Sequence, residues 1–297
     1  MNEHEALVER AVREKRTALL VGGLDTGKST LARALLRAAL EGGRPSAFLD
    51  ADVGQKSVGP PATVTLKHVR SPADLEPEVL SRADALSFVG STSPEGHLLQ
   101  VVTSVANLAR RAREEGAEFL VTDTSGMVSG IYGQILKYHK TELLQPDLVV
   151  GLQRGEELLP LLGVIQRFFQ TEVVPLGIHP AVVPTTVEQR AENREQAMER
   201  YFASGELHRW RVKPTVFMPA LPPLFDPAQL DRLLVGLSDG AGGYLGIGYL
   251  EHAVDEGVLR LISPVAEGPK ALRLGSVRLE EKYRAKRVDL RHLFGSE

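Results

Sequence analysis

The chain has 297 residues, of which 43% are hydrophobic and 25% are charged, and its formal net charge at pH 7 is −3. This length provides material for one large core, or for one domain with a smaller second one. The slightly negative charge excludes a basic coat, so any contact with nucleic acid has to come from a local patch. The absence of cysteine excludes disulfides, a thiol nucleophile and a thiolate metal site.

The first 16 residues are charged and follow a helical pattern, without the apolar core of a signal peptide. No uninterrupted apolar run approaches the roughly 20 residues that a membrane span needs. We therefore expect a soluble, cytoplasmic protein that makes no membrane contact.

Residues 17–31 combine an apolar strand, a phosphate-binding loop and the start of a helix. The pattern G-x-x-x-x-G-K-[ST] is met by Gly22, Gly27, Lys28 and Ser29. Lys28 supplies a point charge for the β- and γ-phosphates, and the Ser29 hydroxyl can bind Mg²⁺. The helix expected at 29–40 turns its positive end toward the anion. The chain is therefore expected to bind a nucleoside triphosphate, through Gly22, Gly23, Leu24, Asp25, Thr26, Gly27, Lys28, Ser29 and Thr30.

Strands and helices alternate beyond this loop. Strands are expected at 46–50, 85–89, 118–123, 147–152 and 171–175, and helices at 98–115, 131–144 and 156–169. This alternation predicts an α/β P-loop NTPase fold, in which a mostly parallel sheet is covered by helices on both faces. Ligands bind at the carboxyl ends of such strands. The phosphate loop, Asp50, Asp52 and Asp123 all lie at such ends, so we expect them to meet in one crevice.

Two acidic strand ends are candidates for holding metal and accepting a proton. Asp123 ends an apolar strand, as an aspartate that holds Mg²⁺ would, although it could also cap the following turn. Asp50 and Asp52 are two residues apart on an extended segment, so they should point the same way, and Gly54 allows a bend beneath them. One acid can support the metal and the other can accept a proton from an attacking hydroxyl. We assign the metal role to Ser29, Asp50 and Asp123 and the catalytic role to Asp52.

A polar helix with two arginines follows the last strand of the series. Arg190 and Arg194 are four residues apart, so both project from one helical face. Such a helix, at about 184–205, suits a lid that closes over a phosphate during transfer. By pattern alone, however, an ordinary solvated helix with Glu–Arg pairs is favoured over a lid.

The composition changes near Pro214, where residues 214–227 form a proline-rich connection that we expect to pack on the surface. A short helix is expected at 229–237, followed by strands at 243–250, 257–262 and 271–279. The predicted organisation is a P-loop domain at 1–213, the connection at 214–227 and a small C-terminal β-rich domain at 228–297.

Taken in order, the motifs resemble the polynucleotide 5′-hydroxyl kinase family. This family includes the RNA kinase subunit of eukaryotic pre-mRNA 3′-end processing, nucleolar pre-rRNA kinases and archaeal relatives. The resemblance rests on residues 23–30, 52–58, 90–94 and 123–126 and on the segment from Arg190 to Phe202. It implies a kinase that uses ATP and Mg²⁺ to phosphorylate the 5′-hydroxyl of a single-stranded or duplex-end nucleic acid, RNA before DNA. No oligomeric state is implied.

The resemblance also implies residue roles. Asp52 would be the general base, while Lys28, Arg190 and Arg194 would stabilise charge. The positions at which relatives contact the 5′-terminal nucleotide are occupied by Gln55, Ser57, Thr92 and His97. Met127 stands where many relatives have a tryptophan, so it is a further expected substrate-binding residue but does not offer aromatic stacking on the terminal base. Two alternatives stay open: an ATP-bound scaffold of an RNA-processing complex without turnover, and a generic P-loop NTPase.

Overall fold

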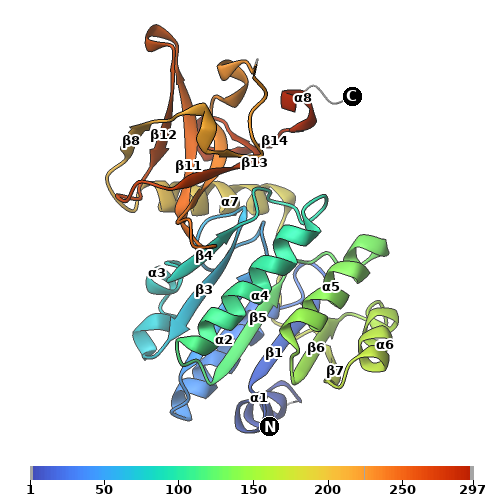
Figure 1. Cartoon of the computed structure of the whole chain (residues 1–297). Coiled ribbons are helices and arrows are strands. Elements are labelled where there is room, and N and C mark those ends of the chain that lie inside the picture. Colours follow the sequence, from blue (N-terminus) through green and yellow to red (C-terminus); the bar gives the residue numbers. More distant parts are fainter. Residues whose placement is uncertain (1–2, 224, 295–297) are drawn as a thin grey trace.

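The computed structural model describes residues 3–223 and 225–294, so Met1, Asn2, Leu224 and residues 295–297 lie outside it. The helices are α1 (Glu3–Glu14), α2 (Lys28–Glu41), α3 (Pro77–Leu80), α4 (Leu98–Glu114), α5 (Gly130–Leu144), α6 (Leu159–Phe168), α7 (Val187–Phe202) and α8 (Arg291–Phe294). The strands are β1 (Thr17–Gly22), β2 (Ser46–Ala51), β3 (Thr63–Val69), β4 (Ala85–Phe88), β5 (Phe119–Thr124), β6 (Leu148–Gln153), β7 (Glu172–Gly177), β8 (His208–Arg211), β9 (Phe217–Met218), β10 (Leu233–Ser238), β11 (Tyr244–Ala253), β12 (Val258–Ser263), β13 (Ala271–Leu279) and β14 (Ala285–Arg287). Figure 1 shows an α/β part, a β-rich part above it, and α7 lying between the two.

The α/β part is built on a sheet with the strand order β4-β3-β2-β5-β1-β6-β7. The strands from β2 to β7 in this order pair in parallel, whereas β3 runs antiparallel to both β2 and β4. Leu20 and Phe48 pack with α1 and α2 on one face, and Leu19 and Leu49 pack with α4, α5 and α6 on the other. Neighbouring residues of a strand face opposite sides, so the unbroken apolar runs of β1 and β2 fill both cores. The predicted P-loop sheet is confirmed.

Every strand and helix expected between residues 17 and 175 is present, with its ends shifted by at most three residues. The strand β3 is also present in this region and was not predicted from the sequence. Its polar residues are buried and paired: the Thr65 hydroxyl donates to the Val58 carbonyl at 2.8 Å, and Lys67 forms an ion pair with Asp84 at 3.1 Å. A strand with buried threonine and lysine lacks an apolar pattern, so composition alone does not reveal it.

The expected helix at 229–237 was wrong. A short 3₁₀ turn at Pro227–Leu230 is followed by β10, which lies between β11 and β13 in the sheet. Leu233, Leu234, Val235 and Leu237 are all fully buried. In a short apolar run that is buried on both faces, the spacing of apolar residues does not distinguish a strand from a helix. Pairing with the two neighbouring strands makes this segment a strand. The strands expected at 243–250, 257–262 and 271–279 are confirmed as β11, β12 and β13.

The α/β and β-rich parts are joined through β4 and α7. Tyr244 at the start of β11 pairs with Leu86 of β4. Phe88 of β4 shares one buried cluster with Met198 and Phe202 of α7 and with β10, β11 and β13. The C-terminal half of α7 is therefore packed into the β-rich part, while its N-terminal half extends toward the phosphate loop.

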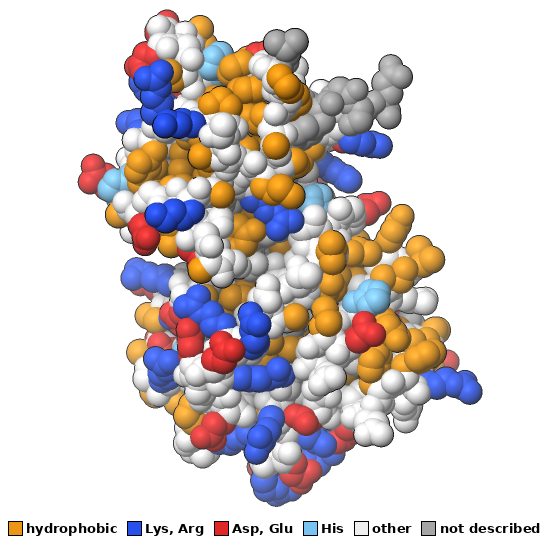
Figure 2. Space-filling model, viewed as in Figure 1, with side chains coloured by type: hydrophobic (Ala, Val, Ile, Leu, Met, Phe, Trp, Pro, Cys, Tyr) orange, Lys and Arg blue, Asp and Glu red, His pale blue; other side chains and the backbone are white. Residues whose placement is uncertain are grey.

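The surface is mixed in charge, and apolar side chains gather on it over α5 and α6 (Figure 2). The large hydrophobic residues exposed there include Ile131, Tyr132, Leu143, Leu159 and Phe168. Within the described residues, no helix combines the length and the apolarity needed to cross a membrane.

Candidate functional site

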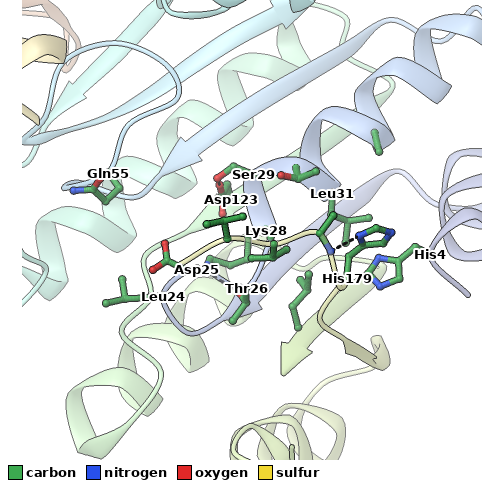
Figure 3. A pocket seen from close by; sticks show the side chains of 18 of the residues that line it. His4, Leu24, Asp25, Thr26, Lys28, Ser29, Leu31, Gln55, Asp123 and His179 are labelled. Atoms are coloured by element: carbon green, nitrogen blue, oxygen red, sulfur yellow. Dashed lines mark hydrogen bonds between the residues drawn. The ribbon is translucent and has the colours of Figure 1, made fainter. Parts of the chain in front are cut away.

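A cavity of about 870 Å³ lies over the carboxyl ends of β1, β2 and β5 and against the start of α2. Its lining brings together Asp52, Gln55, Asp123, Arg190 and the phosphate loop from Leu24 to Thr30. Figure 3 shows Asp123 next to Ser29 of the loop. The remaining predicted site residues, all of them described, lie outside this lining: Asp50, Ser57, Thr92, His97, Met127 and Arg194, and within the loop Gly22 and Gly23.

The phosphate loop has the backbone geometry that an anion cradle needs. Gly27 has a φ of 87°, in the left-handed region that glycine adopts without strain. A side chain at Gly22 would lie 2.5 Å from the Thr26 hydroxyl and 2.8 Å from the Leu152 carbonyl. The Lys28 ammonium is buried and donates to the Gly23 carbonyl at 2.6 Å. The loop therefore holds its lysine at the rim of the cradle, where a phosphate oxygen can replace a main-chain carbonyl.

Ser29 and Asp123 meet directly. The Ser29 hydroxyl donates to Asp123 Oδ2 at 2.5 Å, and the Thr124 N–H donates to Oδ1 at 2.7 Å. Burial raises the pKa of the Asp123 carboxyl from 3.8 to about 6, and the Lys28 charge opposes this in part. A hydroxyl and a carboxylate beside a phosphate cradle are oxygen donors of the kind that Mg²⁺ takes, together with phosphate oxygens and water. Among the described residues there is no cluster of three or more His, Cys, Asp or Glu suited to a metal.

Of the two acids that follow each other at the end of β2, Asp52 lines the cavity and Asp50 does not. Asp50 is buried, accepts hydrogen bonds from the main chain of Ser57 and Val58 at 2.7 and 3.0 Å, and pairs with Lys56 at 3.0 Å. Burial raises the pKa of Asp50, and Lys56 opposes this. Asp50 thus shapes the segment after β2. Its metal role stays a prediction, and the Lys56 pair would have to open for it.

Asp52 turns into the cavity. Its Oδ1 accepts from the main chain of Gly54 and Gln55 at 2.8 and 3.0 Å, which fixes the carboxylate and leaves Oδ2 for a ligand. A side chain at Gly54 would lie 2.8 Å from the Thr92 carbonyl, so this close approach requires glycine. The geometry suits a proton acceptor with a fixed orientation.

The start of α7 is attached to both walls of the cavity. Arg190 Nη1 lies 3.1 Å from Asp25 Oδ2, which also accepts from the Thr185 N–H at 3.1 Å. On the other side, Gln55 Nε2 donates to the Arg190 carbonyl at 3.0 Å. The helix is therefore closed over the phosphate loop, as a lid would be. Arg194, one turn further on, is partly buried, and this burial lowers its pKa while the Asp52 charge raises it.

Three other predicted substrate residues have structural partners. His97 Nε2 lies 3.0 Å from the Ser276 hydroxyl of β13, so His97 connects the α/β part to the β-rich part. Met127 packs against the core beneath α5. Ser57 donates its N–H to Asp50. Their contacts with a substrate stay predictions.

Two buried lysines of α5 lie beside the site and were not predicted from the sequence. Lys137 Nζ donates to the Thr124 hydroxyl at 3.0 Å and the Ser125 carbonyl at 2.7 Å, next to Asp123. Lys140 Nζ donates to the Ala51 carbonyl at 3.2 Å, next to Asp52. Burial lowers the pKa of Lys137 well below its ordinary value and that of Lys140 to about 8. Lys140 is spaced four residues from both Leu136 and Leu144, which face the core, and this spacing could have indicated that the lysines of this helix lie on its buried face.

A phosphate loop at the carboxyl end of a central parallel strand, with acids at the carboxyl ends of the two strands β2 and β5, defines a P-loop nucleotide-binding protein. Residues 22–204 match the family model described as mRNA cleavage and polyadenylation factor CLP1 P-loop. The chain belongs to this family.

Similar proteins span most of the chain. It is 28% identical to a polyribonucleotide 5′-hydroxyl-kinase of Thermococcus kodakarensis, over 90% of this chain and 89% of that protein. It is 30% identical to the polyribonucleotide 5′-hydroxyl-kinase Clp1 of Rattus norvegicus, over 68% of this chain and 50% of that protein. A chain in the wild-type Clp1p–Pcf11p complex has a TM-score of 0.72 at 14% identity, covering 93% of this chain and 77% of that chain. This last likeness supports the fold.

Proposed function

We propose that this protein is an ATP-dependent polyribonucleotide 5′-hydroxyl kinase, which transfers the γ-phosphoryl group of ATP to the 5′-hydroxyl of RNA. The observation that carries the proposal is the convergence of the phosphate loop, Asp52 and Arg190 on one cavity. The archaeal relatives, matched over most of their length, carry the name of this activity.

In this proposal, different residues of the cavity accept the proton, bind the phosphates and hold Mg²⁺. The 5′-hydroxyl oxygen attacks the γ-phosphorus in line, its proton passes to Asp52, and the bond to the bridging oxygen of ADP breaks. Lys28 and the main-chain N–H groups of the loop hold the phosphates. Ser29 and Asp123 would hold Mg²⁺, which supplies charge neutralisation on the phosphate oxygens when bound.

The lid arginines complete the charge balance. Arg190 is held at the rim of the cavity by Asp25. When a triphosphate is bound, its guanidinium can exchange this carboxylate for phosphate oxygens, which match its planar fork. Gln55 is hydrogen-bonded to the same turn of α7, so a movement of Gln55 when the acceptor binds would also move this turn of the lid.

The experiment is phosphorylation of matched 5′-hydroxyl RNA and DNA oligonucleotides with γ-labelled ATP and Mg²⁺. We expect transfer to the 5′ end, with RNA preferred. ATP binding without transfer or hydrolysis would instead support the scaffold, and hydrolysis that oligonucleotides neither capture nor stimulate would support a generic NTPase. The cytoplasmic location and the domain limits at 213 and 228 stay predictions.

A further inference from the structure

The helix α5 carries two lysines whose side chains are shielded from solvent. Lys137 and Lys140 are three residues apart, so they project from the same helical face, and both are fully buried. Leu136 and Leu144 pack in the core that α5 shares with β1, β2 and β5, and α5 also lies against α4 (Figure 1). The helix is therefore a fixed support from which the two long side chains reach the sheet.

The two lysines contact a single cross-strand pair of residues. Ala51 of β2 is the register partner of Thr124 of β5, and this pair is the last of the β2–β5 ladder. Lys140 Nζ donates to the Ala51 carbonyl at 3.2 Å. Lys137 Nζ donates to the Thr124 hydroxyl at 3.0 Å and to the Ser125 carbonyl at 2.7 Å. The helix α5 therefore holds each of the two strands by one lysine, at the point where their pairing ends.

Each of these contacts lies next to an acid of the site. Asp52 directly follows Ala51, and Asp123 directly precedes Thr124. The Thr124 N–H donates to Asp123 Oδ1 at 2.7 Å, and the Thr124 hydroxyl donates to the Leu20 carbonyl of β1 at 2.8 Å. A side chain that fixes Thr124 therefore also fixes the orientation of Asp123 and its distance from the strand that leads into the phosphate loop.

The acids and the lysines also interact through their charges. Burial lowers the pKa of Lys137 well below its ordinary value and that of Lys140 to about 8, and the charges of Asp52 and Asp123 oppose both shifts. A buried amine is costly unless it is hydrogen-bonded, so a lysine that merely filled space here would be a poor choice. The hydrogen bonds to the ends of β2 and β5 are the interactions that offset this cost.

We propose that Lys137 is a positioning residue for the Mg²⁺ site and that Lys140 is one for the proton acceptor. The proposal rests on the proposed function, from which the roles of Asp123 and Asp52 are taken. Lys137 acts through Thr124, which holds Asp123. Lys140 acts through the carbonyl that directly precedes Asp52. None of the described residues of α5 lines the cavity, so the helix acts on the placement of the acids and not on the ligands themselves.

The test separates the two lysines by the step that each affects. Calorimetry would measure ATP binding to Lys137→Met and Lys140→Met over a range of Mg²⁺ concentrations and with a chelator. In Lys137→Met, we expect the Mg²⁺ concentration that gives half of the full gain in ATP affinity to rise about 3–30-fold. This is less than the roughly 10–100-fold typical for a direct partner of a metal ligand, because Lys137 acts through Thr124. ATP binding without Mg²⁺ should stay unchanged, and Lys140→Met should keep the wild-type Mg²⁺ dependence.

Phosphoryl transfer provides a second readout. Excess Mg²⁺ should restore the transfer rate of Lys137→Met, because its metal site is weakened but complete. Excess Mg²⁺ should not restore the rate of Lys140→Met, because the defect of that variant lies in the placement of Asp52. His139→Ala, at an exposed position of the same helix, is the matched control and should behave like the wild type in both assays.

If Lys137→Met does not fold, Thr124→Val tests the same contact from the other side. Valine keeps the branched shape in β5 but removes the hydroxyl that accepts from Lys137. We expect Thr124→Val to shift the Mg²⁺ dependence in the same direction. Thr124→Ser, which keeps a hydroxyl at this position, should return the dependence toward the wild-type value.

Three results would overturn the proposal. The first is an unchanged Mg²⁺ dependence in folded Lys137→Met, or in Thr124→Val if Lys137→Met does not fold. The second is an equal loss of ATP binding with and without Mg²⁺, and the third is the same Mg²⁺ shift in Lys140→Met as in Lys137→Met. ATP binding needs no acceptor. A protein whose Mg²⁺ dependence shifts in Lys137→Met alone but which phosphorylates no 5′-hydroxyl would refute the proposed function and leave the role of Lys137 standing.

Discussion

At the scale of single residues, the site separates two aspartates that look alike in sequence. Asp52 lines the cavity and its Oδ1 is held by main-chain N–H groups, whereas Asp123 is buried against Ser29. Asp52→Asn keeps the shape and loses the proton acceptor. We expect it to leave ATP affinity nearly unchanged and to lower transfer by roughly 10²–10⁴-fold. Equal losses of affinity and rate, measured by calorimetry and single-turnover transfer, would make Asp52 a metal-site residue.

Asp123 makes a pH-dependent contribution to stability. Its pKa is raised from 3.8 to about 6 on folding, so the folded protein holds this proton more tightly than the unfolded chain does. Stability from this group is present below pH 3.8 and is lost as the pH rises through 6. In metal-free protein, Asp123→Asn should therefore raise the free energy of unfolding by roughly 1–3 kcal/mol at neutral pH and hardly change it at acidic pH. Urea unfolding with a chelator measures this, and a gain that does not depend on pH would contradict the burial argument.

At the scale of elements, α5 has an inverted distribution of residue types. Lys137 and Lys140 are fully buried, while Ile131 and Tyr132 are exposed. Lys140→Met would fill the same space but lose the hydrogen bond to the Ala51 carbonyl. Burial lowers the pKa of Lys140 to about 8, which shows that the buried ammonium is costly, so we expect its exchange for an apolar side chain to leave the Tm unchanged or to raise it. Transfer should still fall, by roughly 10–100-fold, because the segment carrying Asp52 is less precisely held.

The control for this variant is His139→Ala, an exposed position of the same helix. A Lys140→Met protein with lost stability and normal kcat would assign this lysine a role in folding alone.

The lid helix has two kinds of arginine. Arg194 is partly buried, and the charges of Glu195, Arg190 and, more weakly, Asp52 act on it. Arg200 lies six residues on and projects from a different face. Arg194→Ala should lower turnover strongly with a smaller effect on ATP affinity, because its contact is made in the transition state. Arg194→Lys should restore little, since a point charge does not replace a guanidinium fork. Similar behaviour of Arg194→Ala and Arg200→Ala in single-turnover phosphorylation would mean that the helix is merely solvated.

Local patterns predicted the elements that local interactions determine. The phosphate loop is specified by residues 22–29 alone, and β1 and β5 are apolar runs that only a covered sheet can bury. The strands β3 and β10 were missed because pairing with distant neighbours decides them. Lys137 and Lys140 were missed for a related reason. Their spacing with Leu136 and Leu144 could place them on the inner face of the helix, but their partners, Thr124 and Ala51, come from other strands, so the helix alone does not show that the two ammonium groups are paired there.

At the scale of the whole molecule, the β-rich part holds the C-terminal end of α7, the helix that we predict to act as a lid. The Tyr201 hydroxyl of α7 accepts from the Ile247 N–H at 2.8 Å and donates to the Ile247 carbonyl at 3.2 Å. Burial of this hydroxyl raises the pKa of Tyr201 to about 12. Through Tyr201 and Phe202, the helix is fixed to β11 at one end, while Arg190 at its other end reaches the phosphate loop. The lid can therefore be misplaced by a change far from the cavity.

Tyr201→Phe tests this anchor. The variant keeps the ring packing but leaves the buried Ile247 N–H unpaired, so we expect a loss of about 1–3 kcal/mol in the free energy of unfolding. We also expect kcat to fall by roughly 3–30-fold, because a small displacement of α7 moves Arg190 and Arg194, while ATP affinity changes little. Tyr132→Phe, at an exposed position of α5, is the matched control and should alter neither quantity. If Tyr201→Phe loses stability but retains full kcat below its unfolding temperature, the β-rich part stabilises the chain without positioning the lid.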